Sequence, residues 1–140
     1  KIVLPEGTDD RVVIAASQAQ EAKYAKITVI GKEKAVKEKA KQLGVSLAGV
    51  NILDYEAAPD FDEYVNTFYE LRKHKGMTPE EARSILVEKT VFYGALMARK
   101  GVVDSFVGGA VATSADVARA AIYCVGIDRK AGTLSSSFVI

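Results

Sequence analysis

The chain has 140 residues, of which 49% are hydrophobic and 26% charged, and its formal net charge is +1. This size and composition are typical of one globular domain with an apolar core. The near-neutral charge argues against nucleic acid or a membrane surface as a partner, and no apolar run approaches the roughly 20 residues that span a bilayer. The single cysteine, Cys124, excludes an internal disulfide and is typical of a protein of the reducing cytoplasm.

The first part of the chain predicts alternating strands and helices. Three short segments indicate strands: the apolar run 1–5, which ends in a turn, the segment 26–30, which Gly31 closes, and the segment 50–53. Thr8 and Asp9 can cap the first intervening helix, and Gly44 follows the second as a C′ residue would. This order predicts parallel strands with right-handed crossovers, as in a doubly wound α/β sheet.

The middle of the chain predicts helices. Asp60 and Glu63 resemble a capping box at the start of one helix, and Gly76 ends it. The segment 78–81 gives a stronger start signal, with a threonine at the N-cap, proline at N1 and an acid at N3. Another helix is expected at 90–100.

The last third predicts a strand at 104–107, a helix from Thr113 to about Tyr123, and a final strand from about Leu134. The chain begins without methionine and stops within that last strand, so we expect a piece of a longer protein. Residues 1–140 should form one α/β domain whose mostly parallel sheet carries helices on both faces.

The turn between the strand and the helix, residues 108–114, indicates an anion site. Ligands of open parallel sheets bind beyond the carboxyl ends of the strands, where this turn and the turn Pro5–Gly7 both lie. Glycines allow close approach, and the amides and dipole of a helix start favour negative charge. Thr113 is expected to be the N-cap with Asp116 at N3, which leaves amides and a hydroxyl for a phosphate. The turn contains neither a Walker motif nor a full Gly-x-Gly-x-x-Gly.

Two arginines leave alternatives open. Arg119 lies three residues after Asp116, so it can form an intrahelical ion pair, but its nearly apolar helix also favours a specific partner, either a structural carboxylate or a ligand anion. Arg72 borders the apolar stripe of its helix. It either complements the negative end of that helix or binds a phosphate with its planar fork.

Other reactive side chains give weaker signals. His74 lies among lysines and is expected to be exposed and not catalytic. Cys124 ends an apolar helix and is expected to be buried and inert. For Glu6 we expect a solvated loop position, with a position facing the cleft as the alternative. No set of residues has metal-ligand spacing, so no metal is expected.

Four segments, in this order, resemble one family, and the resemblance extends over the whole chain. They are Leu4-Pro-Glu-Gly-Thr-Asp-Asp-Arg11, Tyr69-Glu-Leu-Arg-Lys-His-Lys-Gly76, Thr90-Val-Phe-Tyr-Gly-Ala-Leu-Met97 and Gly109-Ala-Val-Ala-Thr-Ser-Ala-Asp-Val-Ala-Arg119. They are similar to the acetyl/butyryl phosphate transferase family, which includes the phosphate acetyltransferases. The second and fourth segments are the most specific.

The resemblance implies reversible transfer of an acetyl group between coenzyme A and phosphate. Coenzyme A, phosphate and acetyl phosphate would be the small-molecule substrates, and no cofactor is implied. The family fold is like that of isocitrate dehydrogenase, with two α/β domains around a cleft, and homodimers are usual. Residues 1–140 would be the first of these domains.

The resemblance also implies site residues. Arg72 and Arg119 match two substrate-binding arginines, and the hydroxyl pair Thr113 and Ser114 matches the acyl phosphate site. Gly109 and Ala110 of the same motif are assigned to substrate binding with them. The family's general base, an aspartate, comes from a C-terminal segment with no counterpart here. No catalytic residue is therefore assigned, and the chain alone should be inactive.

Three positions depart from the family pattern. Ala112 stands where histidine is usual, Ala120 where proline is usual, and Gly108 where serine is common. These departures leave the acyl-chain preference open. A phosphate butyryltransferase with a wider acyl pocket is one alternative, and a non-catalytic domain that binds acyl phosphate or coenzyme A is another.

Overall fold

A parallel β-sheet forms the centre of the molecule. The computed structural model describes residues 1–128, 130, 132 and 133, and within them the strand order is β3-β2-β1-β4, with every pairing parallel. The strands are β1 (Ile2–Leu4), β2 (Ile27–Ile30), β3 (Asn51–Leu53) and β4 (Ser105–Phe106). The predicted α/β sheet is thus confirmed, while the strand expected from Leu134 lies outside the described residues.

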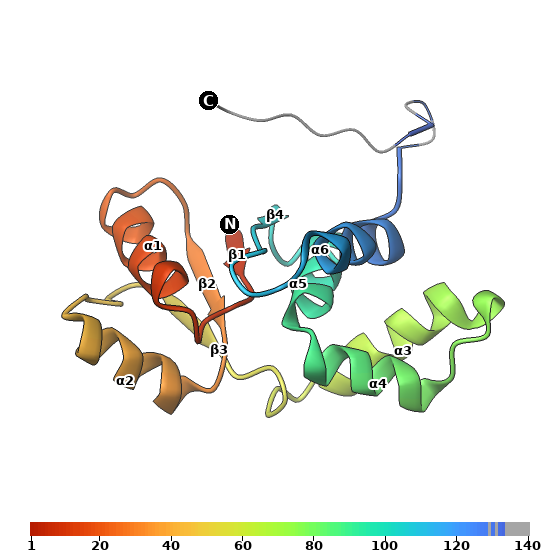
Figure 1. Ribbon diagram of the computed structural model, residues 1–140, viewed down its shortest axis with the longest axis horizontal. Helices are drawn as coiled ribbons and strands as arrows, with labels where there is room; N and C mark the ends of the chain where they lie inside the picture. Colours follow the sequence, from red (N-terminus) through yellow and green to blue (C-terminus); the bar gives the residue numbers. More distant parts are fainter. Residues whose placement is uncertain (129, 131, 134–140) are drawn as a thin grey trace.

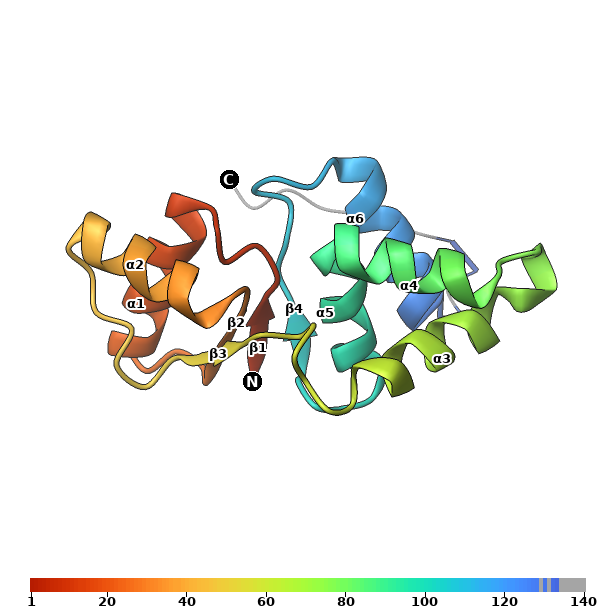
Figure 2. The same cartoon turned by 90° about the horizontal axis from the view of Figure 1, so that it is seen from below.

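Helices cover both faces of the sheet, as predicted (Figures 1 and 2). One face carries α1 (Asp10–Glu21) and α2 (Glu33–Leu43). The other side carries α3 (Phe61–Arg72), the 3₁₀ turn η1 (Lys73–Lys75), α4 (Pro79–Glu88), α5 (Thr90–Arg99), α6 (Ser114–Ala120) and η2 (Ala121–Val125). The helix predicted from Thr113 to about Tyr123 is present, but its second half, η2, is π-helical.

The two faces follow from the alternation of side chains along each strand. Ile27 and Val29 of β2 pack with α1 and α2, whereas Ile30 and Val3 pack into the larger cluster beneath the other helices. Because successive side chains of a strand point to opposite faces, a strand covered on both sides is apolar throughout. This explains why β1 is apolar throughout and why β2 contains only one polar residue, Thr28.

The helix ends test the predicted caps. Asp9 caps α1 by accepting from the Arg11 amide, and Gly44 ends α2 in the left-handed conformation. Thr78 and Glu81 form a reciprocal capping box. The capping box predicted at Asp60 is wrong. Asp60 lies in a turn with φ −97° and ψ 6°, not in the extended conformation of a usual N-cap, and its side chain makes no capping hydrogen bond.

The strand order creates a switch point between β1 and β4. From β1 the chain proceeds outward to β2 and β3, then returns on the opposite side of β1 to form β4. The loops that follow β1 and β4 diverge to opposite faces at this point, and ligands of such sheets bind there. The predicted positions of the turns Pro5–Gly7 and 108–114 are confirmed, since both lie at the carboxyl ends of parallel strands.

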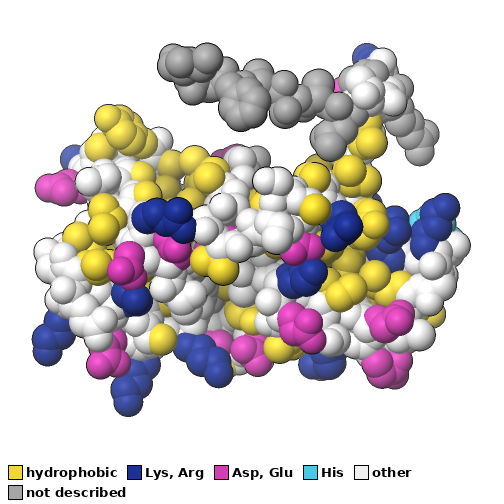
Figure 3. All heavy atoms as spheres, in the orientation of Figure 1, with side chains coloured by type: hydrophobic (Ala, Val, Ile, Leu, Met, Phe, Trp, Pro, Cys, Tyr) yellow, Lys and Arg dark blue, Asp and Glu magenta, His cyan; other side chains and the backbone are white. Residues whose placement is uncertain are grey.

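The face of the molecule shown in Figure 3 has no dominant charge. Lysine and arginine side chains are interspersed with aspartate and glutamate on the face shown in Figure 3, in line with the net charge of +1. Among the described residues, no helix is both long and apolar enough to cross a membrane.

Gly7 is packed too tightly for a side chain. A Cβ atom there would lie 2.5 Å from Cγ1 of Val29 and 2.6 Å from the carbonyl oxygen of Ile30. We therefore expect Gly7→Ala to lower the free energy of unfolding by about 1–3 kcal/mol, measured as a shift in the urea midpoint. The exposed neighbour Thr8 serves as the control, and Thr8→Ala should change stability by less than about 0.5 kcal/mol. Equal stabilities for the two variants would contradict this account.

Candidate substrate site

The loop from β4 to α6 is built around two glycines. A Cβ atom at Gly108 would lie 3.1 Å from Cγ1 of Val91 and 3.2 Å from Cγ of Pro5, so the loop runs close against the end of β1. Gly109 has a φ of 114°, a conformation that side chains disfavour. The glycines thus let successive amide groups turn toward one point.

That point is the carboxylate of Glu6. Its Oε2 accepts from the amides of Gly109 and Ala110 at 2.8 and 2.9 Å, and its Oε1 accepts from those of Val111 and Ala112 at 2.8 and 2.6 Å. Glu6 is only 6% exposed. The sequence predicted a site for a ligand anion at this turn, whereas the anion held by the amides of 109–112 is a side chain of the protein itself.

This finding corrects two expectations. Glu6 is not a solvated loop residue, because the cradle holds its carboxylate in the interior. The amides of Gly109 and Ala110 are not free for a ligand, because Glu6 already accepts from both. The assignment of Gly109 and Ala110 to substrate binding stays a prediction. Because their amides are engaged, they could contribute only through the conformation that they give the loop.

The environment of Glu6 favours its charged form. Burial by itself raises the pKa of this carboxyl, but the four amide hydrogen bonds together outweigh burial and bring the pKa below its ordinary value of 4.5. Arg11 lies close by, where its hydrogen bond to Asp9, and after it the charges of Asp9 and Glu6, raise the pKa of the guanidinium. Its Nη2 also donates to the carbonyl oxygen of Ala110 at 2.5 Å. The loop is therefore held through its amides and through one carbonyl.

Thr113 marks the end of the loop and begins α6, as predicted. Its Oγ1 accepts from the Asp116 amide at 3.1 Å and donates to Oδ2 of Asp116 at 3.1 Å. Asp116 in turn accepts from Nζ of Lys89 at 2.9 Å. The hydrogen bond from Lys89 is the main reason that the pKa of Asp116 lies below its ordinary value. Ser114 follows, exposed, and its hydroxyl makes no hydrogen bond within the described part of the chain.

Sequence reasoning missed Lys89. It lies at the junction of α4 and α5, where its φ of −129° and ψ of 83° separate the two helices. No local signal singles it out among the chain's 19 lysines and arginines. Only the packing of α5 against α6 brings it to Asp116.

A pocket of about 480 Å³ opens at this edge of the sheet. Its wall combines the loops after β1, β2 and β3 with the corner formed by Lys89, Thr113 and Asp116. Among the described residues that line it are also Glu6, Tyr55 and Ala112. Of the residues predicted to bind substrate, only Thr113 lines this pocket, whereas the others lie outside its wall: Arg72, Gly109, Ala110, Ser114 and Arg119.

Arg119 makes the intrahelical ion pair that the sequence allowed. Its Nη1 lies 3.5 Å from Oδ1 of Asp116, and its side chain is 56% exposed. A single contact of this length leaves most of the guanidinium free to meet another anion. The ligand role of Arg119 stays a prediction.

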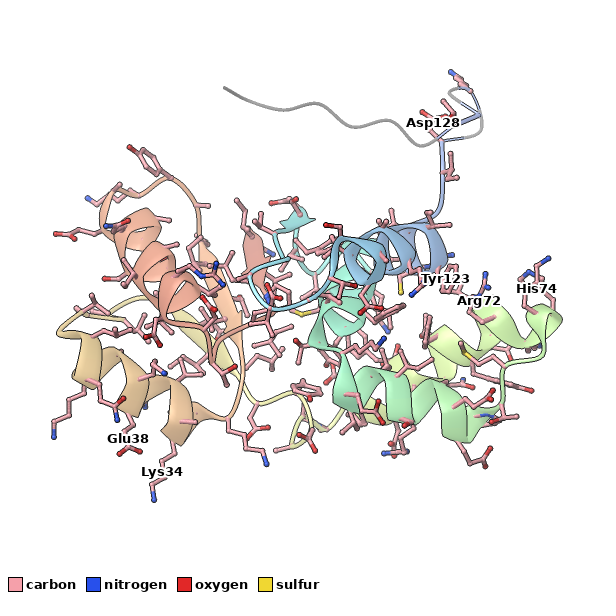
Figure 4. The ribbon with its side chains drawn as sticks, in the orientation of Figure 1. Lys34, Glu38, Arg72, His74, Tyr123 and Asp128 are labelled. Carbon is pink, nitrogen blue, oxygen red and sulfur yellow. The ribbon has the colours of Figure 1, made fainter. Side chains whose placement is uncertain are left out.

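Arg72 reaches the segment that continues α6. The centre of its guanidinium lies 3.8 Å from the centroid of the Tyr123 ring in η2, and Figure 4 shows the two side chains meeting between α3 and η2. The Nε atom of Arg72 is buried and has no hydrogen-bond partner among the described residues. Stacking on the tyrosine fixes the plane of the guanidinium without using its hydrogen-bonding fork. Tyr123 is a second contact that sequence reasoning missed.

The other reactive side chains singled out in the sequence are His74 and Cys124. His74 lies exposed in η1, at the far end of α3 in Figure 4. Cys124 is buried, and burial raises the pKa of its thiol to about 12, so it is inert at neutral pH. Within the described residues, no group of three or more histidine, cysteine, aspartate or glutamate side chains could hold a metal ion.

Comparison with known proteins shows the family of this chain. The family described as "Phosphate acetyl/butaryl transferase" matches residues 1–140. The chain belongs to this family. The phosphate acetyltransferase of Acetivibrio thermocellus is 41% identical over 139 residues, which are 99% of this chain and 41% of that protein. The phosphate acetyltransferase of Clostridium acetobutylicum is 33% identical over 140 residues, which are all of this chain and 42% of that protein.

Solved structures of the family share the fold. The EutD phosphotransacetylase from Staphylococcus aureus matches with a TM-score of 0.80 and 31% identity, covering 91% of this chain and 38% of that one. A phosphotransacetylase from Streptococcus pyogenes matches with a TM-score of 0.79 and 31% identity, covering 88% of this chain and 37% of that one. The chain thus spans about two fifths of the length of these members of the phosphate acetyl/butaryl transferase family.

The lowered pKa of Glu6 predicts a pH dependence of stability. At neutral pH, we expect Glu6→Gln to lower the free energy of unfolding by about 2–3 kcal/mol, because it removes charge-assisted hydrogen bonds in the interior. As the pH falls below 4.5, the unfolded carboxyl takes up a proton before the folded one does, so the wild-type protein loses this advantage. Urea unfolding of both proteins, from neutral pH to about pH 3, should show the gap between them closing. A gap that does not change with pH would contradict the charged state of Glu6.

Proposed function

We propose that the whole protein containing this chain transfers an acetyl group reversibly between coenzyme A and phosphate. In one direction the coenzyme A thiolate attacks the carbonyl carbon of acetyl phosphate. A carbon–sulfur bond forms, the bond from the carbonyl carbon to the phosphate oxygen breaks, and phosphate leaves with the electron pair. Coenzyme A is a substrate in this reaction, and the proposal includes no cofactor.

The observation that carries this proposal is the corner of Lys89, Thr113 and Asp116 beside the pocket at the switch point. It offers cationic and hydroxyl groups next to a cavity large enough for an acyl phosphate. Outside the wall of this pocket, Ser114 at the start of α6 and Arg72 on α3, beside η2, offer further donors. Such donors stabilise negative charge on a departing phosphate when they are held in place beforehand. Membership of the family supports the same reaction.

The general base belongs, in this proposal, to a part of the whole protein that these residues do not include. The family resemblance implies an aspartate there, in a second α/β domain across the cleft. A cytoplasmic homodimer is proposed on the same ground. These statements follow from the resemblance and from the share of the relatives that the chain covers.

A butyryl transferase is the second candidate, and one observation favours it. Ala112 lines the pocket at a position where the family's acetyltransferases usually carry histidine. A methyl group in place of an imidazole leaves more room beside Thr113. A longer acyl chain would gain about 0.8 kcal/mol for each methylene buried there.

The proposal is tested by assaying the whole protein with coenzyme A and a series of acyl phosphates. We expect thioester formation from acetyl phosphate, and the ratio of kcat/KM for acetyl and butyryl phosphate then separates the two candidates. A protein that binds acyl phosphate and coenzyme A but releases no phosphate would instead be a binding domain, and the proposed activity would be wrong.

Residues 1–140 alone should not turn over acetyl phosphate and coenzyme A, because the proposed base lies elsewhere. The measurement is thioester formation by the purified chain under conditions where the whole protein is active. The whole protein with the Arg72→Ala change is the control, because it keeps every domain but has a weakened substrate site. Its rate shows how much activity such a site retains. Turnover by residues 1–140 would show that the catalytic residues lie within this chain.

The two arginines should act on substrate binding. In the whole protein, Arg72→Ala or Arg119→Ala should raise the KM for acetyl phosphate about tenfold to a hundredfold, since a charge-assisted contact contributes about 1.5–3 kcal/mol. Lysine at either position should restore only part of the loss, because it keeps the charge without the planar fork.

Lys73 provides a matched control for these variants. It lies next to Arg72 in sequence, but it pairs with Glu70 on the exposed side of the helix, so Lys73→Ala should leave the KM near that of the wild type. Unchanged kinetics in both arginine variants, with only the urea midpoint lowered, would assign Arg72 and Arg119 purely structural roles.

A further inference from the structure

Backbone cradles of the kind formed by residues 109–112 ordinarily bind the anion of a ligand. Here the cradle is filled from within by Glu6, whose two carboxylate oxygens each accept from two amides. A ligand phosphate cannot share this place, because the amides are already engaged and the carboxylate would repel it. Any substrate anion must therefore bind to other donors.

The cradle also sets the wall of the pocket. Glu6, Val111, Ala112 and Thr113 all line the cavity of about 480 Å³, and the last bonded amide, that of Ala112, directly precedes Thr113. Without an anion in the cradle, four neighbouring amides would lose their partner together. The loop would then no longer be held in the conformation that places Thr113 at the pocket.

Glu6 is itself held in place from several sides. The Gly7 amide donates to the carbonyl oxygen of Ile30 at 3.0 Å, and the Glu6 carbonyl accepts from the Asp9 amide at 3.0 Å. On the other side of the loop, Arg11 donates to the carbonyl oxygen of Ala110. The segment Pro5–Arg11 therefore holds the loop at fixed geometry, and it does so before any ligand arrives.

We propose that Glu6 is a positioning residue of the substrate site: it takes the place of a bound anion in the cradle 109–112, and so directs the substrate phosphate to Thr113, Ser114 and the neighbouring cations. The kinetic part of this inference rests on the proposed acyl transfer. The structural part, that Glu6 holds the loop 109–112, does not rest on that function, because hydrogen bonding in the cradle can be measured without any substrate.

Hydrogen exchange of the four amides provides that measurement, in the whole protein. In Glu6→Gly the amides of residues 109–112 should exchange at least about tenfold faster, because their acceptor is gone. Formate, a small carboxylate, should enter the vacated space and restore their protection in a saturable manner. The same addition should lower the KM for acetyl phosphate, which we expect to be raised about tenfold in this variant.

Glu6→Gln gives a sharper pattern and covers the case in which Glu6→Gly does not fold. A glutamine keeps one oxygen and replaces the other by an NH₂ group, which cannot accept. One pair of amides, either 109 with 110 or 111 with 112, should stay protected while the other pair loses protection. Formate should have no effect, because the glutamine side chain still fills the space.

Glu33 serves as the matched control. Its carboxylate is exposed in the first turn of α2, where it pairs with Lys37. Glu33→Gly should lower stability without changing exchange at 109–112, and formate should change neither.

The outcomes separate the possibilities. Protection at 109–112 that is unchanged in both Glu6 variants would overturn the proposal. So would lost protection with unchanged KM in an active enzyme, because the cradle would then not position the site. If the wild-type protein shows no transferase activity, the proposed function fails, while selective loss and formate rescue of protection would still establish what Glu6 does to the loop.

Discussion

The substrate edge of this domain depends on one interaction, the acceptance of four backbone amides by the carboxylate of Glu6. An ionised carboxylate is costly to bury, and four consecutive amides without acceptors are costly as well. The amides donate to the carboxylate and the carboxylate accepts from the amides, so neither the buried charge nor the row of amides would be stable without the other. The contact joins the loops on the two sides of the switch point, and both loops contribute to the wall of the pocket, Thr113 among their residues.

The strand and helix pattern, and hence the α/β class, could be predicted from local sequence because turn residues separate short apolar runs. An anion site at this turn was also predictable, because paired glycines before a capping threonine allow successive backbone amides to point toward one acceptor. What the sequence could not give was the identity of the anion. Glu6 lies 103 residues before Gly109, and nothing local distinguishes a glutamate in a cradle from one in solvent. The capping box at Asp60 failed for a local reason, since the turn directly before the helix sets the backbone conformation of Asp60.

The partners of Arg72 and Lys89 were beyond prediction for a different reason, namely that they depend on how helices pack, whereas the local ion pair of Arg119 with Asp116 could be foreseen from their spacing. Tyr123 meets Arg72 only because η2 continues α6 across the end of α3, and Lys89 meets Asp116 only because α5 lies against α6. The π-helical turn shifts the register of side chains after Ala120, and no hydrophobic period reveals such a shift in advance. Periodicity identifies the buried side of a helix, but not the individual partner on a neighbouring helix.

The strand order also dictates when the pocket can form during folding. β1 and β2 pair across about 25 residues, from Ile2 to Ile27, whereas β1 and β4 pair across about a hundred, from Ile2 to Ser105. Closing the longer loop costs more chain entropy, and that cost falls only when the helices between have packed. The carboxylate of Glu6 can enter the cradle only when residues 109–112, which follow β4, lie at the end of β1. The cradle thus depends on strands that are far apart in the sequence and are joined only by the completed sheet.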